Sequence, residues 1–583
     1  MLLPKLLFVS YASTLVAQST VTVRDNAHNL TYVGFSFAGT EQFQGINFGQ
    51  DTSGANRFKP PKAFTYPTGT TIQATAAGAA CPQNTILSFL GAISENPGVF
   101  NVSEDCLNLE VVRPAGTKQD ANLPVMVWIS GQGDEEGSYN YSLYNPTALV
   151  TGAATKGTPV IYASMNYRVN IFGFANSPAL RTEGSLNAGL LDQRLALQWI
   201  QSNIATFGGN PKNVTIFGES DGGVSVGLHM TSFGGNGTAP FRRAIMQSGA
   251  AASDPGVTGD ATSTNTAAVA QLAGCTGTNS SLVLDCLREI SMVQLLNAVL
   301  LFENSTTATE ANGASQDLFF PTVDGSYIPV APSNLIRTGR FHKNISIITG
   351  WNENDGSIFV PPTLNGSSAA QAFLNSSYPH LTSTTLSTLI SMYPISDFIA
   401  AAQATQISPY FLQASQIYRD INFACPSIDI SHRVTRFGST SYLYVLNTTS
   451  LSSVLQLFNA SFEGVIHFSD VPFVFNQPNV GFGTTAAANV TATRMSGSWA
   501  HFAATGNPSG DSAITLSGWT QAFNKTQAAV TSQNVTDASI RVIGGPRAGQ
   551  AQLSSNGGAT VEPRLLERCA FINSAAFYQQ LQT

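Results

Sequence analysis

Short apolar runs recur along this 583-residue chain and are separated by stretches with helical periodicity. Runs of this length without strict alternation are typical of strands that are buried on both faces of a parallel sheet. Their recurrence therefore predicts one large sheet. The clearest runs are Pro124–Ile129, Pro159–Asn166, Asn213–Phe217, Ala244–Gln247, Ile345–Thr349 and Ser441–Leu446.

Helical patterns fall between these runs. Leu190 to Ala205 carries apolar residues at three- and four-residue spacings, as an amphipathic helix does. Strands that alternate with helices predict an α/β protein with a mostly parallel central sheet flanked by helices. Residues 255–345 are predicted to be a helical insertion. Nothing resembles a linker, so we expect residues 18–583 to form a single domain.

The N-terminus has the features of a secretory signal peptide. Lys5 precedes an apolar stretch from Leu6 to Val16, and the small residue Ala17 is a suitable cleavage point. No later segment has about 18 consecutive apolar residues, so no integral membrane segment is expected. We therefore predict that residues 1–17 are removed and that the mature protein is secreted.

Charged residues make up only 10% of the chain, against roughly 25% in typical soluble domains. Glycan is a candidate for keeping such a surface soluble. Fifteen Asn-x-Ser/Thr sequons support N-glycosylation of an extracellular protein. They lie at Asn29, Asn101, Asn140, Asn213, Asn236, Asn279, Asn304, Asn344, Asn365, Asn375, Asn447, Asn459, Asn489, Asn524 and Asn534.

Net charge and cysteine spacing exclude some functions. The formal net charge of −7 gives a nucleic-acid partner no electrostatic basis. No Cys-x-x-Cys pair is present, which argues against structural zinc, and we expect no metal or other cofactor. Six cysteines in a secreted chain indicate disulfides. Spacing favours the pairs Cys81–Cys106, Cys275–Cys286 and Cys425–Cys569.

Residues Gly218 to Gly222 fit the pattern G-x-S-x-G, with Ser220 at its centre. The chain also produces this pattern around Ser225, so the pattern alone does not choose a nucleophile. Ser220 directly follows a predicted buried strand, where a strained turn into a helix would expose its hydroxyl. Ser225 would already lie inside that helix. We therefore predict that Ser220 is the nucleophile.

Further sequence blocks accompany the G-x-S-x-G pattern. They are Gly45-Ile46 with Arg57-Phe58, Ser103 to Leu109 (SEDCLNL), Asn203 to Gly223 (NIATFGGNPKNVTIFGESDGG), and Phe241 to Gly249 (FRRAIMQSG). In these blocks the chain resembles the type-B carboxylesterase/lipase family, over about residues 35–575. The resemblance implies an α/β-hydrolase fold, a triad in the order Ser, acid, His, and the same disulfide pairing.

A serine hydroxyl needs a base to take its proton, and histidine suits that task near neutral pH. The order of the triad excludes His28 as the base, because it precedes the serine. His229 is also an unsuitable base, because it would lie inside the helix that follows the nucleophile. Composition does not choose among the remaining histidines. The block from Gly464 to Phe475 resembles the family block that carries the catalytic histidine, which implies His467. His501 is expected in a helix against the core.

The acid should orient the imidazole and stabilise its charged form. Aligning Gly356-Ser357 with the family block implies Asp355, although many relatives have glutamate there. Glu353 is the alternative within the same loop. Asp324 is expected to terminate a turn instead.

The oxyanion hole is where the chain departs from the family pattern. Backbone N–H donors are expected from Gln132 and Gly133, after an early strand, and from Asp221, after the nucleophile. The family usually has glycine in place of Gln132 and alanine in place of Asp221; Ser130 and Asp134 are departures too. Gln132 would need dihedral angles that glycine adopts more easily. A carboxylate at 221 opposes an oxyanion unless it pairs with a nearby donor.

The loop between Cys81 and Cys106 is a candidate lid with lipid-surface contact. It contains no tryptophan, which argues against a choline-ester specialist. Its apolar cluster could equally pack onto the domain. The cluster comprises Ile86, Leu87, Phe89, Leu90 and Ile93.

These features predict a secreted hydrolase of small-molecule or lipid esters that forms an acyl-enzyme on Ser220. Two alternatives stay open. One is a catalytically weak binding or adhesion protein, because fold does not fix function. The other is an acyltransferase or a tailoring esterase of a secondary metabolite.

Overall fold

The computed structural model describes residues 19–83, 101–309, 317–479, 483–523, 535–555 and 561–583. The predicted signal peptide (1–17) and the apolar cluster of the candidate lid (86–93) lie outside these ranges.

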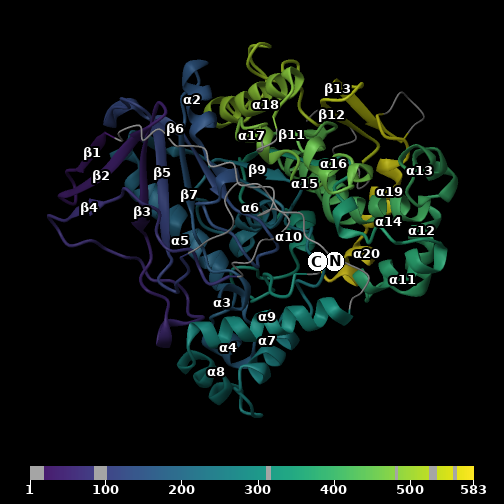
Figure 1. Cartoon of the computed structure of the whole chain (residues 1–583), viewed down its shortest axis with the longest axis horizontal. Helices are drawn as coiled ribbons and strands as arrows, with labels where there is room; N and C mark the ends of the chain where they lie inside the picture. The colour runs from purple at the N-terminus through teal and green to yellow at the C-terminus, as the bar shows by residue number, and fades with distance from the viewer. Residues whose placement is uncertain (1–18, 84–100, 310–316, 480–482, 524–534, 556–560) are drawn as a thin grey trace.

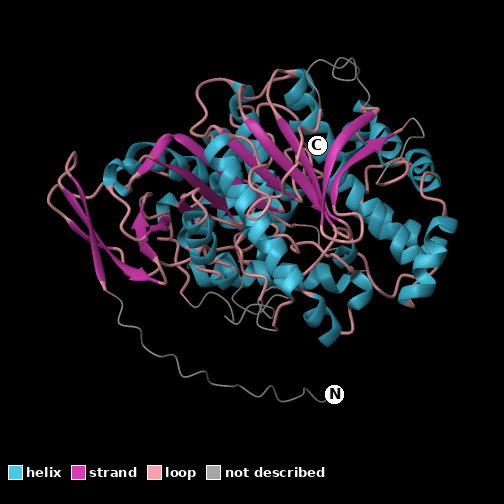
Figure 2. Cartoon of the chain, turned by 90° about the horizontal axis from the view of Figure 1, so that it is seen from above, coloured by secondary structure: helices cyan, strands magenta, loops and turns pink. Residues whose placement is uncertain are grey.

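A single mixed sheet runs through the molecule (Figures 1 and 2). Its strands in the described chain pair in the order β1-β2-β3-β5-β7-β6-β8-β9-β10-β11-β12-β13, and β4 pairs with β2. The strands are β1 (Thr20–Asp25), β2 (Leu30–Phe37), β3 (Thr40–Asn47), β4 (Thr71–Gln73), β5 (Asn108–Pro114), β6 (Leu123–Ile129), β7 (Ile161–Met165), β8 (Gly209–Glu219), β9 (Arg243–Gln247), β10 (Ser346–Asn352), β11 (Ser441–Leu446), β12 (Asp537–Ile543) and β13 (Gly549–Ser554).

The strands from β7 to β12 are parallel, and they include all six that the apolar runs predict. The predicted α/β-hydrolase fold class is confirmed. Antiparallel strands extend both ends of the sheet: β1, β2, β3 and β5 at one end and β13 at the other. These outer strands were not predicted.

The central strands are buried on both faces, which explains their unbroken apolar runs. In β6, Val125 and Val127 point into one core and Met126 and Trp128 into the other. Helices α5, α6 and α15 cover the first face, and α2, α17 and α18 cover the second. The predicted helix from Leu190 to Ala205 is α5.

The helices of the described chain are α2 (Thr147–Thr155), α3 (Asn170–Phe174), α4 (Pro178–Glu183), α5 (Ala188–Asn203), α6 (Asp221–Thr231), α7 (Ala261–Leu272), α8 (Ser280–Glu289), α9 (Met292–Thr309), α10 (Pro332–Thr338), α11 (Ser367–Ser377), α12 (Ser383–Ser391), α13 (Ile399–Thr405), α14 (Pro409–Arg419), α15 (Cys425–Arg436), α16 (Ser452–Leu457), α17 (Val471–Val474), α18 (Ala486–Thr505), α19 (Leu565–Ile572) and α20 (Ala575–Leu581).

Two groups of helices depart from the basic alternation. Helices α7 to α10 form the insertion predicted for residues 255–345. A second group, α11 to α15, separates β10 from β11 and was not predicted. Between α14 and α15 the chain makes a π-helical turn, Asp420–Ala424, a feature that often occurs at functional sites.

The three disulfides pair as predicted. Cys81 binds Cys106, Cys275 binds Cys286, and Cys425 binds Cys569. The last bond joins the start of α15 to α19 across a sequence separation of 144 residues. Within the described ranges, no helix is long and apolar enough to cross a membrane.

Candidate active site

The predicted site residues lie in loops at the carboxyl ends of neighbouring parallel strands, the edge at which α/β sheets bind ligands. The loop after β6 carries Gln132 and Gly133, β8 leads into Ser220, and β10 leads into the loop of Asp355. His467 follows β11 after a longer connection that contains α16.

Ser220 occupies a sharp turn between β8 and α6. Its backbone has φ 58° and ψ −129°, a conformation that a residue with a side chain rarely adopts. Glycines on either side make the turn possible. A Cβ on Gly218 would lie 2.5 Å from the backbone of Gly222, and one on Gly222 would lie 2.2 Å from the carbonyl oxygen of Ile129. The turn holds Ser220 partly exposed at the edge of the sheet.

Ser225 lies inside α6, as predicted. It is 1% exposed, and its hydroxyl accepts a hydrogen bond from Gln193 Nε2 at 3.1 Å. A substrate carbonyl has no access to a side chain in this position, so the second G-x-S-x-G match is a packing feature.

His467 lies in the loop between β11 and α17 and pairs with the predicted acid. Its Nδ1 donates a hydrogen bond to Asp355 Oδ1 at 2.9 Å. The imidazole stacks on Phe423, with ring centroids 4.8 Å apart, and meets the edge of Phe359 at 5.2 Å. These contacts fix the orientation of the ring.

Asp355 is fully buried and held from several sides. It accepts hydrogen bonds from Ser248 Oγ at 2.7 Å and from the backbone N–H of Asn352 at 2.7 Å. The acid loop is also tied to the histidine loop, since Val465 donates its N–H to Asn354 Oδ1 at 2.9 Å. A buried carboxylate with this set of donors is suited to hold an imidazolium.

The other candidates lie elsewhere. Glu353 faces Arg547, 4.0 Å away, and is not directed at His467. Asp324 Oδ1 accepts the N–H groups of two residues in a turn, as predicted. His229 is buried in α6, and His501 lies in α18, where Nδ1 contacts the carbonyl oxygen of Asn507.

The second imidazole nitrogen faces a buried acid. His467 Nε2 lies 3.3 Å from Glu219 Oε1 and has no hydrogen-bond partner among the described residues. Burial lowers the pKa of His467, but the charges of Glu219, Asp355 and Asp470 outweigh it and raise that pKa to about 9. Burial raises the pKa of Glu219 well above its usual value, although His467 opposes this shift. The resting histidine therefore favours its protonated form.

The loop after β6 turns through three consecutive residues with positive φ: Gln132 (88°), Gly133 (71°) and Asp134 (52°). Gln132 thus adopts the conformation for which the family pattern has glycine. Its side chain leaves the site, because Nε2 donates to the hydroxyl of Tyr144 at 3.0 Å.

The carboxylate of Asp221 contacts both a predicted oxyanion donor and the predicted nucleophile. The backbone N–H of Gly133 donates to Asp221 Oδ2 at 2.6 Å, and the Ser220 hydroxyl donates to the same oxygen at 3.2 Å. Burial raises the pKa of Asp221, while the hydrogen bond from the N–H of Gly133 lowers it. One of the three predicted oxyanion donors, the N–H of Gly133, is therefore directed at this carboxylate.

Further buried acids surround the hole. Burial and mutual repulsion raise the pKa values of Asp134, Asp254 and Asp317 well above the usual range, and Asp221 contributes to each shift. One oxygen each of Asp134 and Asp254 has no hydrogen-bond partner in the described chain. Within the described residues, no group of three His, Cys, Asp or Glu side chains is placed to hold a metal ion.

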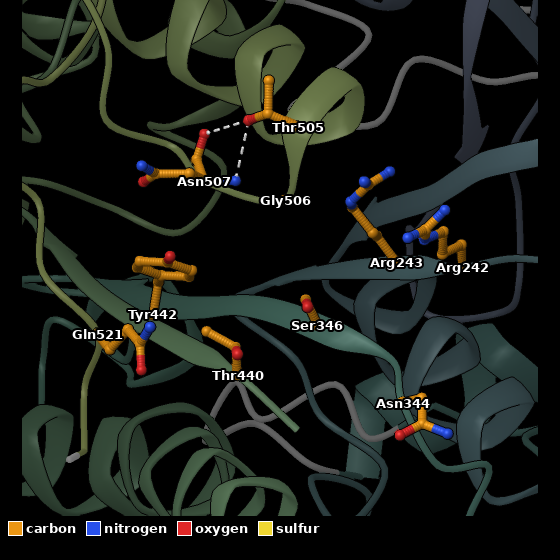
Figure 3. A pocket seen from close by; sticks show the side chains of 10 residues that line it. All are labelled: Arg242, Arg243, Asn344, Ser346, Thr440, Tyr442, Thr505, Gly506, Asn507 and Gln521. Atoms are coloured by element: carbon orange, nitrogen blue, oxygen red, sulfur yellow. Dashed lines mark hydrogen bonds between the residues drawn. The ribbon is translucent and has the colours of Figure 1, made fainter. Parts of the chain in front are cut away.

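A polar pocket lies at the opposite edge of the sheet (Figure 3). Arg243, Ser346 and Thr440, which line it, lie at the starts of β9, β10 and β11. Ser220 and the residues around it follow the other ends of the strands, so this pocket is separate from the candidate site.

Three contacts in the site were not predicted. Glu219 is the second residue of the G-x-S-x-G pattern, and Ser248 lies in the block Phe241 to Gly249, so both belong to motifs of the chain. Phe423 comes from the π-helical turn, which no sequence motif indicates.

Comparison with known proteins identifies the family of the chain. A model of the carboxylesterase family matches residues 23–545. A protein of Byssochlamys spectabilis named as an inactive carboxylesterase-like protein, VdtD, is 37% identical over 94% of both chains. A secreted lipase of Arthroderma benhamiae is 36% identical over 99% of both chains. A secreted triacylglycerol lipase of Gibberella zeae is 35% identical over 66% of this chain and 67% of its own. This chain belongs to the carboxylesterase family.

Proposed function

We propose that this chain hydrolyses carboxylic esters through an acyl-enzyme on Ser220. The observation that carries the proposal is the convergence at one edge of the sheet of a serine in a strained strand-to-helix turn and a buried Asp355–His467 pair. Family membership and the lipase relatives support ester hydrolysis as the type of reaction.

In this mechanism the Ser220 hydroxyl rotates from Asp221 towards His467 Nε2, which takes its proton as Oγ attacks the ester carbonyl carbon. The carbonyl oxygen becomes an oxyanion and accepts N–H groups from Gln132, Gly133 and Asp221. When the bond to the alcohol breaks, His467 gives its proton to the leaving oxygen. A water molecule then loses a proton to His467 and attacks the acyl carbon. The bond from that carbon to Ser220 Oγ breaks, and His467 returns the proton to Oγ as the acid leaves.

Asp355 acts through the histidine. Its bond to Nδ1 leaves Nε2 free to exchange protons with Ser220, and its charge stabilises the imidazolium that forms during attack. Glu219 adds a second negative charge on the other side of the ring.

The proposed setting is extracellular. Cleavage after residue 17 would release the chain, and the sequons would carry N-glycans. The three disulfides and the secreted lipase relatives support this setting. The proposed substrates are small-molecule or lipid esters, with lipid contact through the loop from Cys81 to Cys106.

Hydrolysis of p-nitrophenyl butyrate by the purified protein tests the proposal. Activity that falls to background in both Ser220→Ala and His467→Ala is expected, and activity that survives in Ser220→Ala would contradict it. Comparison of a soluble ester with an emulsified triglyceride would then separate an esterase from a lipase.

One observation favours a second candidate, a catalytically weak binding protein on the same fold. The carboxylate of Asp221 fills the hole that hydrolysis needs, and one close relative is named inactive. Absence of turnover in the wild-type protein, together with absence of reaction at Ser220, would favour this candidate.

A further inference from the structure

We propose that the side chain of Asp221 is an internal occupant of the oxyanion hole, which an ester carbonyl oxygen must displace before Ser220 can react. This inference rests on the proposed function, because a filled hole matters only if Ser220 performs acyl transfer. It assigns to Asp221 a regulatory role that is additional to its backbone N–H.

The contacts of the carboxylate are those expected of an oxyanion. Oδ2 accepts the N–H of Gly133 at 2.6 Å. The residue is 6% exposed, so water does not compete effectively for this donor. Ser220 Oγ, 3.2 Å away, directs its proton at the same oxygen.

The resting charges also resemble those of the reaction intermediate. During attack the site must hold a positive imidazole and a negative oxygen in the hole. In the resting structure, His467 favours its protonated form and its charge stabilises the Asp221 carboxylate. The resting site thus already contains a positive imidazole and a negative oxygen in the hole, the pair of charges that would otherwise form only during attack on an ester.

The hydrogen bonds of the carboxylate oppose its departure from the hole. A carboxylate that leaves the hole loses the N–H of Gly133 at 2.6 Å and the hydroxyl of Ser220 at 3.2 Å. Displacement therefore costs free energy in the step that forms the tetrahedral intermediate.

This arrangement predicts a specific kinetic change in Asp221→Ala. Alanine is the residue that the family pattern usually has here, and it preserves both the helix start and the backbone N–H. Removing one oxyanion donor from a serine hydrolase typically costs 10²–10³-fold in kcat. Freeing the N–H of Gly133 should therefore raise kcat for p-nitrophenyl butyrate at least about tenfold, with KM changed less than about threefold.

Two further measurements separate occupancy of the hole from a general loss of negative charge. A trifluoromethyl ketone, whose adduct places an oxyanion in the hole, should bind Asp221→Ala at least about tenfold more tightly than wild type. The matched control is Asp254→Asn, which removes a neighbouring carboxyl that does not contact Gly133. It should change kcat less than about threefold.

The outcomes are distinguishable. Unchanged kcat and inhibitor affinity in Asp221→Ala, with hydrolysis still dependent on Ser220, would overturn the inference and leave the proposed function standing. Lower activity in a folded Asp221→Ala would mean that the carboxyl assists the reaction. An equal rise of kcat in Asp254→Asn would mean that the loss of a carboxyl group in general, and not release of the Gly133 N–H, causes the effect. If neither wild type nor Asp221→Ala shows hydrolysis abolished by Ser220→Ala, the proposed function itself fails.

Discussion

His467 Nδ1 lies 2.9 Å from Asp355 Oδ1, and the two residues are 112 positions apart in the chain. The acid loop and the histidine loop are hydrogen-bonded to each other, so the pair forms one unit at the edge of the sheet. Loss of the acid should therefore damage catalysis far more than folding.

Asp355→Asn is expected to lower kcat by about 10⁴-fold, because an amide can stabilise the wrong tautomer of His467. Steady-state kinetics and thermal unfolding of the same sample check this. The control is Glu353→Gln in the same loop, which should retain activity within about threefold because that side chain faces Arg547. Loss of activity in Glu353→Gln but not in Asp355→Asn would mean that Glu353, and not Asp355, is the acid that orients His467.

The activity should rise with pH. His467 must be neutral to accept the proton of Ser220, and its pKa is raised to about 9, so kcat/KM of the free enzyme should increase up to an inflection near that value. Glu219→Gln removes one of the raising charges and should move the inflection to lower pH. A bell-shaped pH profile of kcat/KM centred below pH 6 would contradict the raised pKa of His467.

The same shift has a consequence for stability. Because the pKa of His467 is higher when folded than the roughly 6.5 of an unfolded chain, proton binding stabilises the fold. This contribution is complete below about pH 6.5 and is lost as pH rises through about 9. Chemical unfolding across that range should show a steeper loss of stability in wild type than in His467→Ala.

Ser225→Ala should leave activity within about threefold of wild type and cost about 1 kcal/mol of unfolding free energy, because a buried hydrogen bond to Gln193 is lost. Ser220→Ala should show the opposite pattern, with no activity and nearly normal stability. Loss of activity in a folded Ser225→Ala protein would mean that the two G-x-S-x-G serines had been assigned the wrong way round.

The Cys425–Cys569 bond should matter more for stability than Cys275–Cys286. Closing loops of 144 and 11 residues is worth about 5 and about 3 kcal/mol in the chain-entropy model. Replacing each pair by alanine and measuring guanidinium unfolding tests this order. A larger loss from the short loop would show that local packing, not loop entropy, dominates.

The buried parallel strands and α5 could be predicted because their apolar patterns are local. The outer strands were harder: β2 and β3 contain polar residues and glycines, and only their pairing with neighbours defines them. Helices α11 to α15 belong to a region whose contacts join residues that are distant in the chain, such as the stacking of Phe423 on His467 in the candidate site.

Within the site, motif position predicted Ser220, and family matching predicted Asp355 and His467. The side chain of Asp221 could be recognised as unusual for the family, but the groups that it contacts could not be inferred. Its carboxylate meets Gly133, 88 residues away, only because β6 and β8 are neighbours in the sheet. The direction of a side chain across two loops depends on this tertiary arrangement.

The most direct test of the central claim is reaction of the purified protein with a fluorophosphonate, followed by mass spectrometry of its peptides. We expect a single adduct on Ser220, formed in wild type and Ser225→Ala and lost in His467→Ala. An adduct on another serine, or labelling of Ser220 at the same rate without His467, would contradict it.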